Sequence, residues 1–311
     1  MTHTQSSIAI RETVGSASGP LLLVHGGAGS YGPSSTPERR ARVAADLRRA
    51  LEAGWSLLEA GASAADAVCA AVRVMEDAEE FNAGRGAALT SEGKAQMDAC
   101  LMTGEDGEVG SVAGVTAARH PIDAARAVKE QTKHVLFAHP DADQLRHWGV
   151  ETEDPSYFVT EARRQSLERA RLEGDEWEKH GTVGAVARDA DGHVAAATSI
   201  GGITNQLPGR VGDSPLPGCG TYAADDAAAV SCTGIGEAFV KEVAAHEVAD
   251  RMRFAGQSAS DAAAAALDGV ASHHGDGGMI VVPAKGSGVF AFNSEMMNRG
   301  WMDASGSGVE A

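Results

Sequence analysis

The hydrophobic positions in the first third of the chain predict one strand followed by two helices. Residues 21–24 are all apolar and run into the segment 25–29 (HGGAG), which predicts a buried strand entering a glycine turn. Apolar residues then recur at helical spacing from Val43 to Leu58, and again from Val68 to Met75. Thr36-Pro37 and Ser63 precede these two stripes and predict where the helices begin.

The middle of the chain predicts short strands, further helices and a linker. Strands and glycine loops are expected from Phe81 to Thr116, and helices over Pro121–Lys133 and Tyr157–Leu172. The charged stretch Glu173–His180 has no apolar period, which predicts an exposed linker.

The second half opens with a predicted hairpin. Thr182–Arg188 and His193–Ser199 are strand-like runs on either side of the turn-forming tetrad at 189–192 (DADG). A loop rich in Gly and Pro follows over residues 201–220. The segment Ala223–Ser231 leads to the motif at 233–237 and then to a long helix ending near Phe254. A helix over Ser258–Ala271 and a hairpin of Met279–Pro283 and Val289–Phe292 follow. Strands at both ends of each half, with helix pairs between them, predict an α/β protein whose sheets are covered by helices.

Composition indicates which partners the chain can bind. Its 311 residues suffice for a substantial core, and 43% apolar with 22% charged residues are typical of a soluble globular protein. The net charge of −17 disfavours nucleic acids and anionic membranes as partners, because binding to phosphate needs clustered Lys and Arg. An anionic substrate would therefore have to be held by a local arginine.

Cysteine usage and the N-terminal residues predict a cytoplasmic protein. Cys69, Cys100, Cys219 and Cys232 are widely spaced, which favours reduced thiols over a zinc site or a disulfide framework. Residues 1–20 are polar and lack the apolar region of a signal peptide. No apolar run approaches the length that spans a membrane.

The dipeptide Gly181–Thr182 carries the most chemical information. It stands between the charged stretch and the apolar run Val183–Ala187. Cleavage of the bond before Thr182 would give this residue a free α-amine, so that it would hold both a hydroxyl nucleophile and its general base. Taken alone, Thr182 is better explained as an ordinary β-branched residue of a strand.

Five motifs in a fixed order favour Thr182 as a nucleophile over an ordinary strand residue. They are 25–29 (HGGAG), 81–84 (FNAG), 181–184 (GTVG), 208–215 (PGRVGDSP) and 233–237 (TGIGE). Together they resemble the plant-type L-asparaginase/isoaspartyl peptidase family of N-terminal-nucleophile hydrolases, from about residue 20 to residue 300. Each motif alone is a common glycine loop, but five in register, with Gly–Thr at a strand start, are specific.

The resemblance implies a fold and a maturation step. The fold would be an α/β four-layer αββα sandwich of the N-terminal-nucleophile hydrolase type. The precursor would cleave itself between Gly181 and Thr182 into an α subunit (1–181) and a β subunit (182–311), which would pair into an (αβ)2 assembly. Glycine is expected before the nucleophile, because a strained backbone costs least without a Cβ.

The resemblance also implies the catalytic roles. Thr182 would attack the side-chain amide of L-asparagine, or the β-aspartyl bond of a dipeptide, and form an acyl-enzyme. The Thr233 hydroxyl and the Gly234 N–H would stabilise the oxyanion. Arg210 would hold the substrate α-carboxylate with two parallel hydrogen bonds, and Asp213 with the Gly236 carbonyl would hold its α-ammonium.

Several of these residues also have simpler explanations. Arg210 and Asp213 could form an ordinary ion pair in a turn, and Thr233 could be a helix N-cap as well as a donor. His25 is expected to be structural and bonded to nearby backbone, because a free N-terminal Thr needs no histidine base. His246 and the pair at 273–274 are expected to be solvated rather than metal ligands.

No cofactor is expected. A structural sodium ion, bound through backbone oxygens of the segment Met75–Arg85, is implied by the resemblance alone.

Ile200 departs from the family pattern. In the segment 198–202 (TSIGG) the family has a threonine at the position of Ile200, and that hydroxyl belongs to the network around the nucleophile. Isoleucine removes both the donor and the acceptor. We therefore expect slower self-cleavage or reduced turnover, unless Ser199 or a water replaces the missing hydrogen bond.

Three alternatives differ in their requirements. A glycosylasparaginase would share the chemistry, but the cytoplasmic N-terminus argues against it. An unprocessed, catalytically silent relative that binds or scaffolds is supported by Ile200 only. A serine α/β-hydrolase needs a G-x-S-x-G elbow, which the sequence does not contain.

Overall fold

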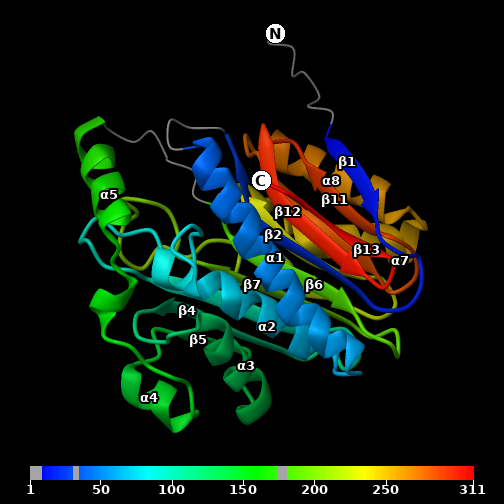
Figure 1. Cartoon of the computed structure of the whole chain (residues 1–311), viewed down its shortest axis with the longest axis horizontal. Helices are drawn as coiled ribbons and strands as arrows, with labels where there is room; N and C mark the ends of the chain where they lie inside the picture. The colour runs from blue at the N-terminus through cyan, green and yellow to red at the C-terminus, as the bar shows by residue number, and fades with distance from the viewer. Residues whose placement is uncertain (1–8, 31–34, 174–180) are drawn as a thin grey trace.

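The computed structural model describes residues 9–30, 35–173 and 181–311, and it shows a mixed α/β protein with two β-sheets (Figure 1). The eight-stranded sheet contains, in spatial order, β13 (Gly306–Glu310), β12 (Met296–Asp303), β2 (Leu21–Gly29), β6 (Val183–Arg188), β7 (Val194–Ile200), β3 (Met97–Thr103), β4 (Val109–Val115) and β5 (Leu136–Ala138). The five-stranded sheet contains β1 (Ile10–Val14), β11 (Gly288–Phe292), β10 (Gly277–Pro283), β9 (Ala228–Gly234) and β8 (Thr221–Ala223). Neighbouring strands are antiparallel except for β4 and β5.

Helices pack on one face of each sheet. An apolar cluster joins the eight-stranded sheet to α1 (Pro37–Glu59), α2 (Ala64–Asp77) and α3 (Pro121–Gln131). A second cluster joins the five-stranded sheet to α6 (Gly236–Glu242), α7 (Ala244–Ala255) and α8 (Ala259–Ser272). The other described helical elements are α4 (Ala142–His147), α5 (Glu161–Glu173), η1 (Gly84–Gly86) and η2 (Pro155–Phe158).

The two sheets meet through a third apolar cluster on their other faces. Its fully buried members include Leu21 and Leu23 of β2, Val186 of β6, Ala196 of β7, Ala229 of β9 and Ile280 of β10. Successive residues of a strand point to opposite faces, so the same strands also contribute to the clusters under the helices. The space between the sheets is therefore lined by every second residue of these strands.

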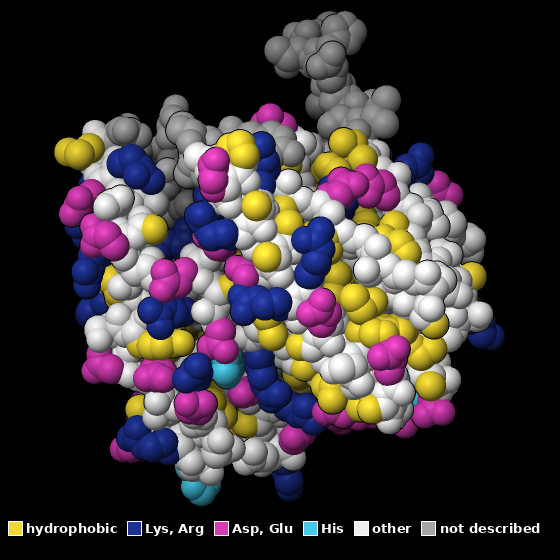
Figure 2. Space-filling view, viewed as in Figure 1, with side chains coloured by type: hydrophobic (Ala, Val, Ile, Leu, Met, Phe, Trp, Pro, Cys, Tyr) yellow, Lys and Arg dark blue, Asp and Glu magenta, His cyan; other side chains and the backbone are white. Residues whose placement is uncertain are grey.

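The outer surface is mixed in charge. On the face shown in Figure 2, Lys and Arg side chains are interspersed with Asp and Glu rather than gathered in one patch. Among the helices in the described ranges, none has the length and apolar character needed to cross a membrane.

The structure confirms the predicted N-terminal helices and the central hairpin. The Thr36 side chain accepts the N–H of Arg39 at 3.2 Å and caps α1, and Ser63 caps α2 in the same way. The apolar stripes predicted for these two helices are buried. Strands β6 and β7 form the hairpin, with Arg188 opposite Val194.

Two local predictions were wrong, and tertiary contacts explain both. The predicted glycine turn at 25–29 is part of strand β2, which continues to Gly29 because Ala28 and Gly29 pair with Met297 and Met296 of β12. The long helix ending near Phe254 is two helices, because Val243 adopts a left-handed conformation with φ 54°. The N–H groups of Ala245 and His246 bond there to the carbonyls of residues 219 and 218. A preceding loop thus sets where the second helix begins.

Some elements were not anticipated, and one prediction lies outside the described residues. Strand β1 pairs with β11, and the C-terminal hairpin β12–β13 extends the larger sheet beyond β2. The predicted linker Glu173–His180 lies, beyond residue 173, outside the described residues.

Candidate active site

Thr182 lies directly before β6 and points into the space between the sheets. Val186, four residues later, belongs to the inter-sheet cluster, and even spacing along a strand keeps both side chains on one face. Thr182 is 1% exposed, and its Oγ1 has no hydrogen-bond partner among the described residues. Strands β6 and β7 pair Val183 with Ser199, so the next step in the register places Ile200 opposite Thr182.

Gly181 packs directly against Gly27 of β2. A Cβ on Gly181 would lie 2.0 Å from the Gly27 Cα, and a Cβ on Gly27 would lie 2.4 Å from the Gly181 Cα. Close contact between two backbones therefore requires glycine at both positions.

His25 connects Thr182 to the other sheet. Its Nδ1 lies 3.0 Å from the Thr182 carbonyl oxygen, and its Nε2 lies 2.9 Å from the Ser231 hydroxyl of β9. Burial lowers the pKa of His25 to about 3, although the bond to Thr182 works in the opposite direction. The imidazole is therefore neutral at ordinary pH, and the expected bond from His25 to backbone is present.

Thr233 and Gly234 end strand β9, and Thr233 lies on the same face as Ser231. The Thr233 Oγ1 accepts the N–H of Ala28 at 3.3 Å, and Ala28 follows the glycine that Gly181 contacts. Thr233 and the Gly181–Thr182 bond therefore both lie next to the same short segment of β2. The N-cap explanation of Thr233 is wrong, because the cap residue of α6 is Ile235 and no side chain caps that helix.

Arg210, Asp213 and Gly236 lie together, as the resemblance implies. A Cβ on Gly236 would lie 2.9 Å from Asp213 Oδ1 and 3.0 Å from Arg210 Nη2. The Arg210 Nε and Nη2 donate to the two oxygens of Glu237, each at 3.0 Å. Within the described part of the chain, Arg210 Nη1 and Asp213 Oδ2 are buried without a hydrogen-bond partner. A cationic and an anionic group next to Gly236 are thus without a partner among the described residues.

Glu237 and Asp98 are residues of this site that the sequence analysis did not identify. Glu237 was quoted only as the end of a motif, although it pairs with Arg210. Asp98 of β3 accepts the N–H of Gly114 at 2.8 Å and also that of Gly212, next to Asp213. An acidic residue in an otherwise apolar strand (MDACLM, from Met97) was the available signal for Asp98.

The carboxyls of this cluster are strongly affected by their surroundings. Burial raises the pKa of Asp213 to about 7, and Arg210 opposes the shift without cancelling it. Burial also raises the pKa of Asp98 to about 6. For Glu237 burial acts in the same direction, but Arg210 more than offsets it and the pKa is lowered. Perturbed pKa values that cluster in one place are typical of functional sites.

Ser199 does not replace the hydroxyl that Ile200 lacks. Its Oγ donates to Glu76 Oε1 of α2 at 2.6 Å, which is on the helix-covered face of β7. Thr198 points the other way, and its Oγ1 lies 2.7 Å from the Ser231 Oγ. Ile200 shares the face of Thr198 and is 5% exposed. An apolar side chain therefore lies beside the Thr182 hydroxyl.

The segment Met75–Arg85 is held by hydrogen bonds from other parts of the chain. Arg163 donates to the carbonyl of Phe81 at 3.0 Å and also to that of Gly86. The carbonyl of Asn82 accepts the N–H of Gly201, directly after Ile200. A guanidinium thus already supplies positive charge to this loop, and the implied sodium ion stays a prediction. No group of three or more His, Cys, Asp or Glu side chains in the described ranges is arranged to hold a metal.

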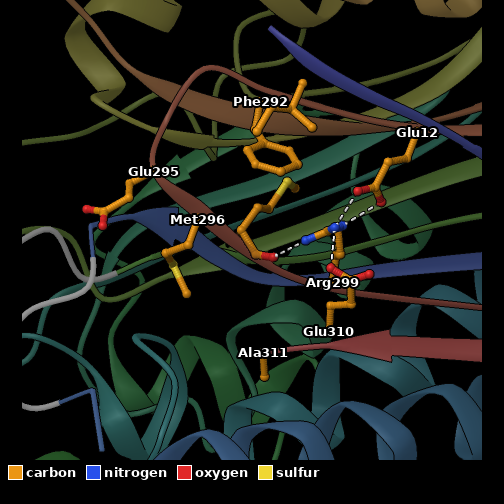
Figure 3. Close-up of a pocket in the computed structure, with 9 residues that line it drawn as sticks. Glu12, Phe292, Glu295, Met296, Arg299, Glu310 and Ala311 are labelled. Atoms are coloured by element: carbon orange, nitrogen blue, oxygen red, sulfur yellow. Dashed lines mark hydrogen bonds and ion pairs between the residues drawn. The ribbon is translucent and has the colours of Figure 1, made fainter.

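A cavity of about 220 Å³ is lined by residues that do not belong to this candidate site (Figure 3). It is lined by Ile10, Glu12, Phe292, Glu295, Met296, Met297, Arg299, Glu310 and Ala311. The Arg299 guanidinium donates to Glu12 at 2.9 Å and also contacts Glu310. Because this cation is already paired with two carboxylates, the cavity offers little to an anionic substrate.

Comparison with known proteins agrees with the motifs. The chain matches the model of the asparaginase family over residues 18–309. It is 43% identical to the isoaspartyl peptidase of Salmonella typhimurium, over 90% of this chain and 94% of that protein. It is 40% identical to the plant-type L-asparaginase of Pyrococcus abyssi, over 90% of this chain and 95% of that protein. The isoaspartyl peptidase/L-asparaginase of Homo sapiens is also 40% identical, over 89% of this chain and 91% of that protein.

Proposed function

The chain belongs to the asparaginase family, and we propose that it is a self-processing hydrolase that cleaves L-asparagine to aspartate and ammonia, β-aspartyl dipeptides, or both. The names of its relatives support these two substrate classes. One observation carries the proposal. Thr182 and Thr233 lie next to one segment of β2, and the Arg210–Asp213 pair lies beside Gly236, three residues after Thr233.

Maturation begins with attack of the Thr182 hydroxyl on the Gly181 carbonyl. The peptide nitrogen of Thr182 leaves, an ester forms between Gly181 and the Thr182 oxygen, and water hydrolyses it. The products are an α subunit (1–181) and a β subunit (182–311), with a free amine on Thr182. The two helix-covered sheets would together form the four-layer αββα sandwich of N-terminal-nucleophile hydrolases, and two αβ units would pair as (αβ)2.

Turnover uses the new amine. It accepts the proton of the Thr182 hydroxyl, which attacks the β-carbonyl of the substrate. The Thr233 hydroxyl and the Gly234 N–H stabilise the oxyanion, a contribution typically worth about 3–4 kcal/mol of barrier. Ammonia or an amino acid leaves with the proton from the amine, and water then releases aspartate from the acyl-enzyme.

The charged cluster binds the amino-acid end of the substrate. The ionised Asp213 accepts the α-ammonium, and burial makes this contact strong because water does not compete. Glu237 occupies the Nε–Nη2 side of Arg210. The α-carboxylate would therefore approach the Nη1–Nη2 end of the guanidinium.

The test combines chain cleavage with product release. Wild-type protein should yield two fragments divided before Thr182 and should release ammonia from L-asparagine, an amino acid from β-aspartyl dipeptides, or both. Thr182→Ala should remain a single chain and release neither product. Wild type that persists as one chain and is inactive would instead identify a silent relative, which the apolar neighbour Ile200 would explain. Activity confined to substrates with a sugar on the amide nitrogen would identify a glycosylasparaginase.

A further inference from the structure

A continuous hydrogen-bond network of buried side chains ends on the backbone of Thr182. His25 Nδ1 faces the Thr182 carbonyl at 3.0 Å, and His25 Nε2 faces the Ser231 Oγ at 2.9 Å. The Ser231 Oγ lies 2.7 Å from the Thr198 Oγ1, which lies 2.7 Å from the Thr221 Oγ1. We call His25, Ser231, Thr198 and Thr221 the hydroxyl network. All four side chains are fully buried.

Gly184 leaves the space that this network occupies. A Cβ at this position would lie 2.0 Å from the Ser231 Oγ and 2.4 Å from His25 Nε2. Gly184 follows Thr182 by two residues and faces the same side of β6. Even an alanine there would displace the bond between His25 and Ser231.

If the Thr182 carbonyl accepts a hydrogen bond from His25, the donors and acceptors of the network can be ordered in only one direction. A carbonyl oxygen can only accept, so His25 must carry its proton on Nδ1. With a pKa of about 3, His25 is neutral and has no second N–H, so its Nε2 must accept from Ser231. Ser231 in turn accepts from Thr198. The single proton of Thr221 can then reach either Thr198 or the carbonyl of Ser214, which lies 3.0 Å away.

Cleavage makes this bond to the Thr182 carbonyl more important. In the precursor, Thr182 is fixed by peptide bonds on both sides. In the mature β subunit the bond to Gly181 is gone, and the residue is held only from its carbonyl side. Rotation about that side would carry the hydroxyl and the amine away from Thr233 together.

We propose that the hydroxyl network is a positioning device, in which Ser231 and Thr198 orient His25 so that its Nδ1–H fixes the Thr182 carbonyl and holds the terminal nucleophile in register with the oxyanion donors. The inference rests on the proposed function. His25 is a positioning residue because it contacts the backbone of the nucleophile rather than the substrate, and Ser231 and Thr198 act through His25.

The first test compares Ser231→Ala with Ser166→Ala. Ser166 is also buried, but on α5, where its Oγ accepts from Arg169 at 3.1 Å. Ser231→Ala should lower kcat of the cleaved enzyme on the order of tenfold with little change in KM, since misplacement of a reacting group slows the chemical step. Its self-cleavage should slow less than its turnover. Ser166→Ala should leave both rates unchanged, and equal slowing of cleavage and turnover by Ser231→Ala would overturn the inference.

The second test separates the two ring nitrogens. An asparagine at position 25 can reproduce the Nδ1–H donor, whereas a glutamine reaches toward the Nε2 position. His25→Asn should therefore keep several-fold more turnover than His25→Gln at similar thermal stability. Equal losses in the two variants would show that His25 serves only the packing of the core.

The third test needs no substrate. Nitrogen-15 spectra of histidine-labelled protein should show His25 neutral at pH 7 with its proton on Nδ1, and His25→Asn identifies the resonance by its loss. A proton on Nε2 would overturn the inference. If wild type is cleaved but hydrolyses no substrate, the proposed function fails, while the tautomer still decides whether His25 donates to the Thr182 carbonyl.

Discussion

The space between the two sheets has two ends that are built by the same strands with opposite chemistry. At one end it is filled by apolar side chains, and at the other by hydroxyls, an imidazole and carboxyls. In each of four strands, an apolar residue and a polar residue share the face toward the other sheet. They are Leu23 and His25 of β2, Val186 of β6 and Thr182 just before it, Ala196 and Thr198 of β7, and Ala229 and Ser231 of β9. Position along a strand, rather than the face of the sheet, therefore separates the core from the site.

The two ends differ in how their buried groups are satisfied. Apolar side chains need only close packing, and burial of each large one stabilises the fold by about 1.5–3 kcal/mol. Buried polar groups need partners, and the hydroxyl network provides them for His25 and Ser231. Thr182 Oγ1, Arg210 Nη1 and Asp213 Oδ2 are without partners in the described part of the structure. These are the groups that the proposed chemistry assigns to the substrate and the reaction.

The largest effect on activity is expected from removing the nucleophile at the polar end. Thr182→Ala should abolish self-cleavage and lower turnover by at least about a thousandfold, since no other group takes the covalent role. Thermal unfolding should change little, because the lost hydroxyl has no partner among the described residues. Intact-mass analysis and product release measure the two effects. Thr182→Ser keeps a hydroxyl and should still be cleaved, and cleavage of Thr182→Ala would contradict the assignment.

The next largest effect is expected at the charged cluster. Asp213→Asn should lower kcat/KM by about 100-fold, because loss of one partner of a buried charge pair costs about 2–5 kcal/mol. Asp46→Asn is the control, because this carboxylate pairs with Arg49 on the surface of α1. Steady-state kinetics on both variants give the comparison. An unaltered kcat/KM in Asp213→Asn would remove this residue from the site.

Because the pKa of Asp213 is raised, both kcat/KM and the free energy of unfolding should depend on pH. Its pKa is about 7 in the folded chain, so the free enzyme holds an ionised acceptor only as pH rises through that value, and kcat/KM should rise with it. The effect on stability has the opposite sign. The folded state keeps the proton between the ordinary value of 3.8 and about 7, so this group lowers the free energy of unfolding as pH increases through that window. Asp213→Asn should remove both dependences, which pH-rate profiles and denaturant titrations can follow.

A moderate gain in the rate of self-cleavage is expected at Ile200, an apolar residue at the polar end. Ile200→Thr returns a hydroxyl beside Thr182 and should speed self-cleavage by about tenfold, equivalent to one hydrogen bond of about 1.4 kcal/mol. Ile200→Val keeps the β-branch without a hydroxyl and should bring no gain. The appearance of fragments over time measures both rates. Equal acceleration in the two variants would point to side-chain size instead.

The smallest effect on activity is expected at the apolar end, where stability should change instead. Leu23→Ala should lower the free energy of unfolding by about 2–5 kcal/mol, because Leu23 is fully buried between the sheets. Turnover per cleaved molecule should be unchanged at temperatures where the variant is folded. Denaturant titration and active-site-normalised kinetics test the two halves of this prediction. A large fall in turnover would mean that the two ends are coupled.

Much of the local structure could be predicted because local signals decide it. Thr36 and Ser63 accept backbone N–H groups at the helix starts that they predict. The hairpin of β6 and β7 follows from two apolar runs around a turn, where Asp189 accepts the N–H groups of residues 191 and 193. Thr182, Thr233, Arg210 and Asp213 were proposed as site residues from short motifs in a fixed order. The structure places Arg210 and Asp213 beside Gly236, and Thr233 beside the segment of β2 that Gly181 contacts.

Other features depend on contacts that no local pattern contains. The break at Val243 is made by the carbonyls of Gly218 and Cys219, which lie more than twenty residues earlier. Glu237 becomes a site residue only because the loop with Arg210 folds over α6. Strand β1 could not be inferred from its own short sequence, since its pairing with β11 spans almost the whole chain.

The sequence by itself indicated many of the elements, the order of the motifs and the residues that the proposed chemistry uses, because periodicity, caps and residue chemistry are local properties. Only the tertiary structure decided what surrounds those residues. It set Gly181 against Gly27, turned Ser199 toward the helices, and joined His25 to both Thr182 and Ser231. The physical reason is that pairing and burial depend on strand register and on the stacking of two sheets, which bring together residues as far apart as 25 and 231.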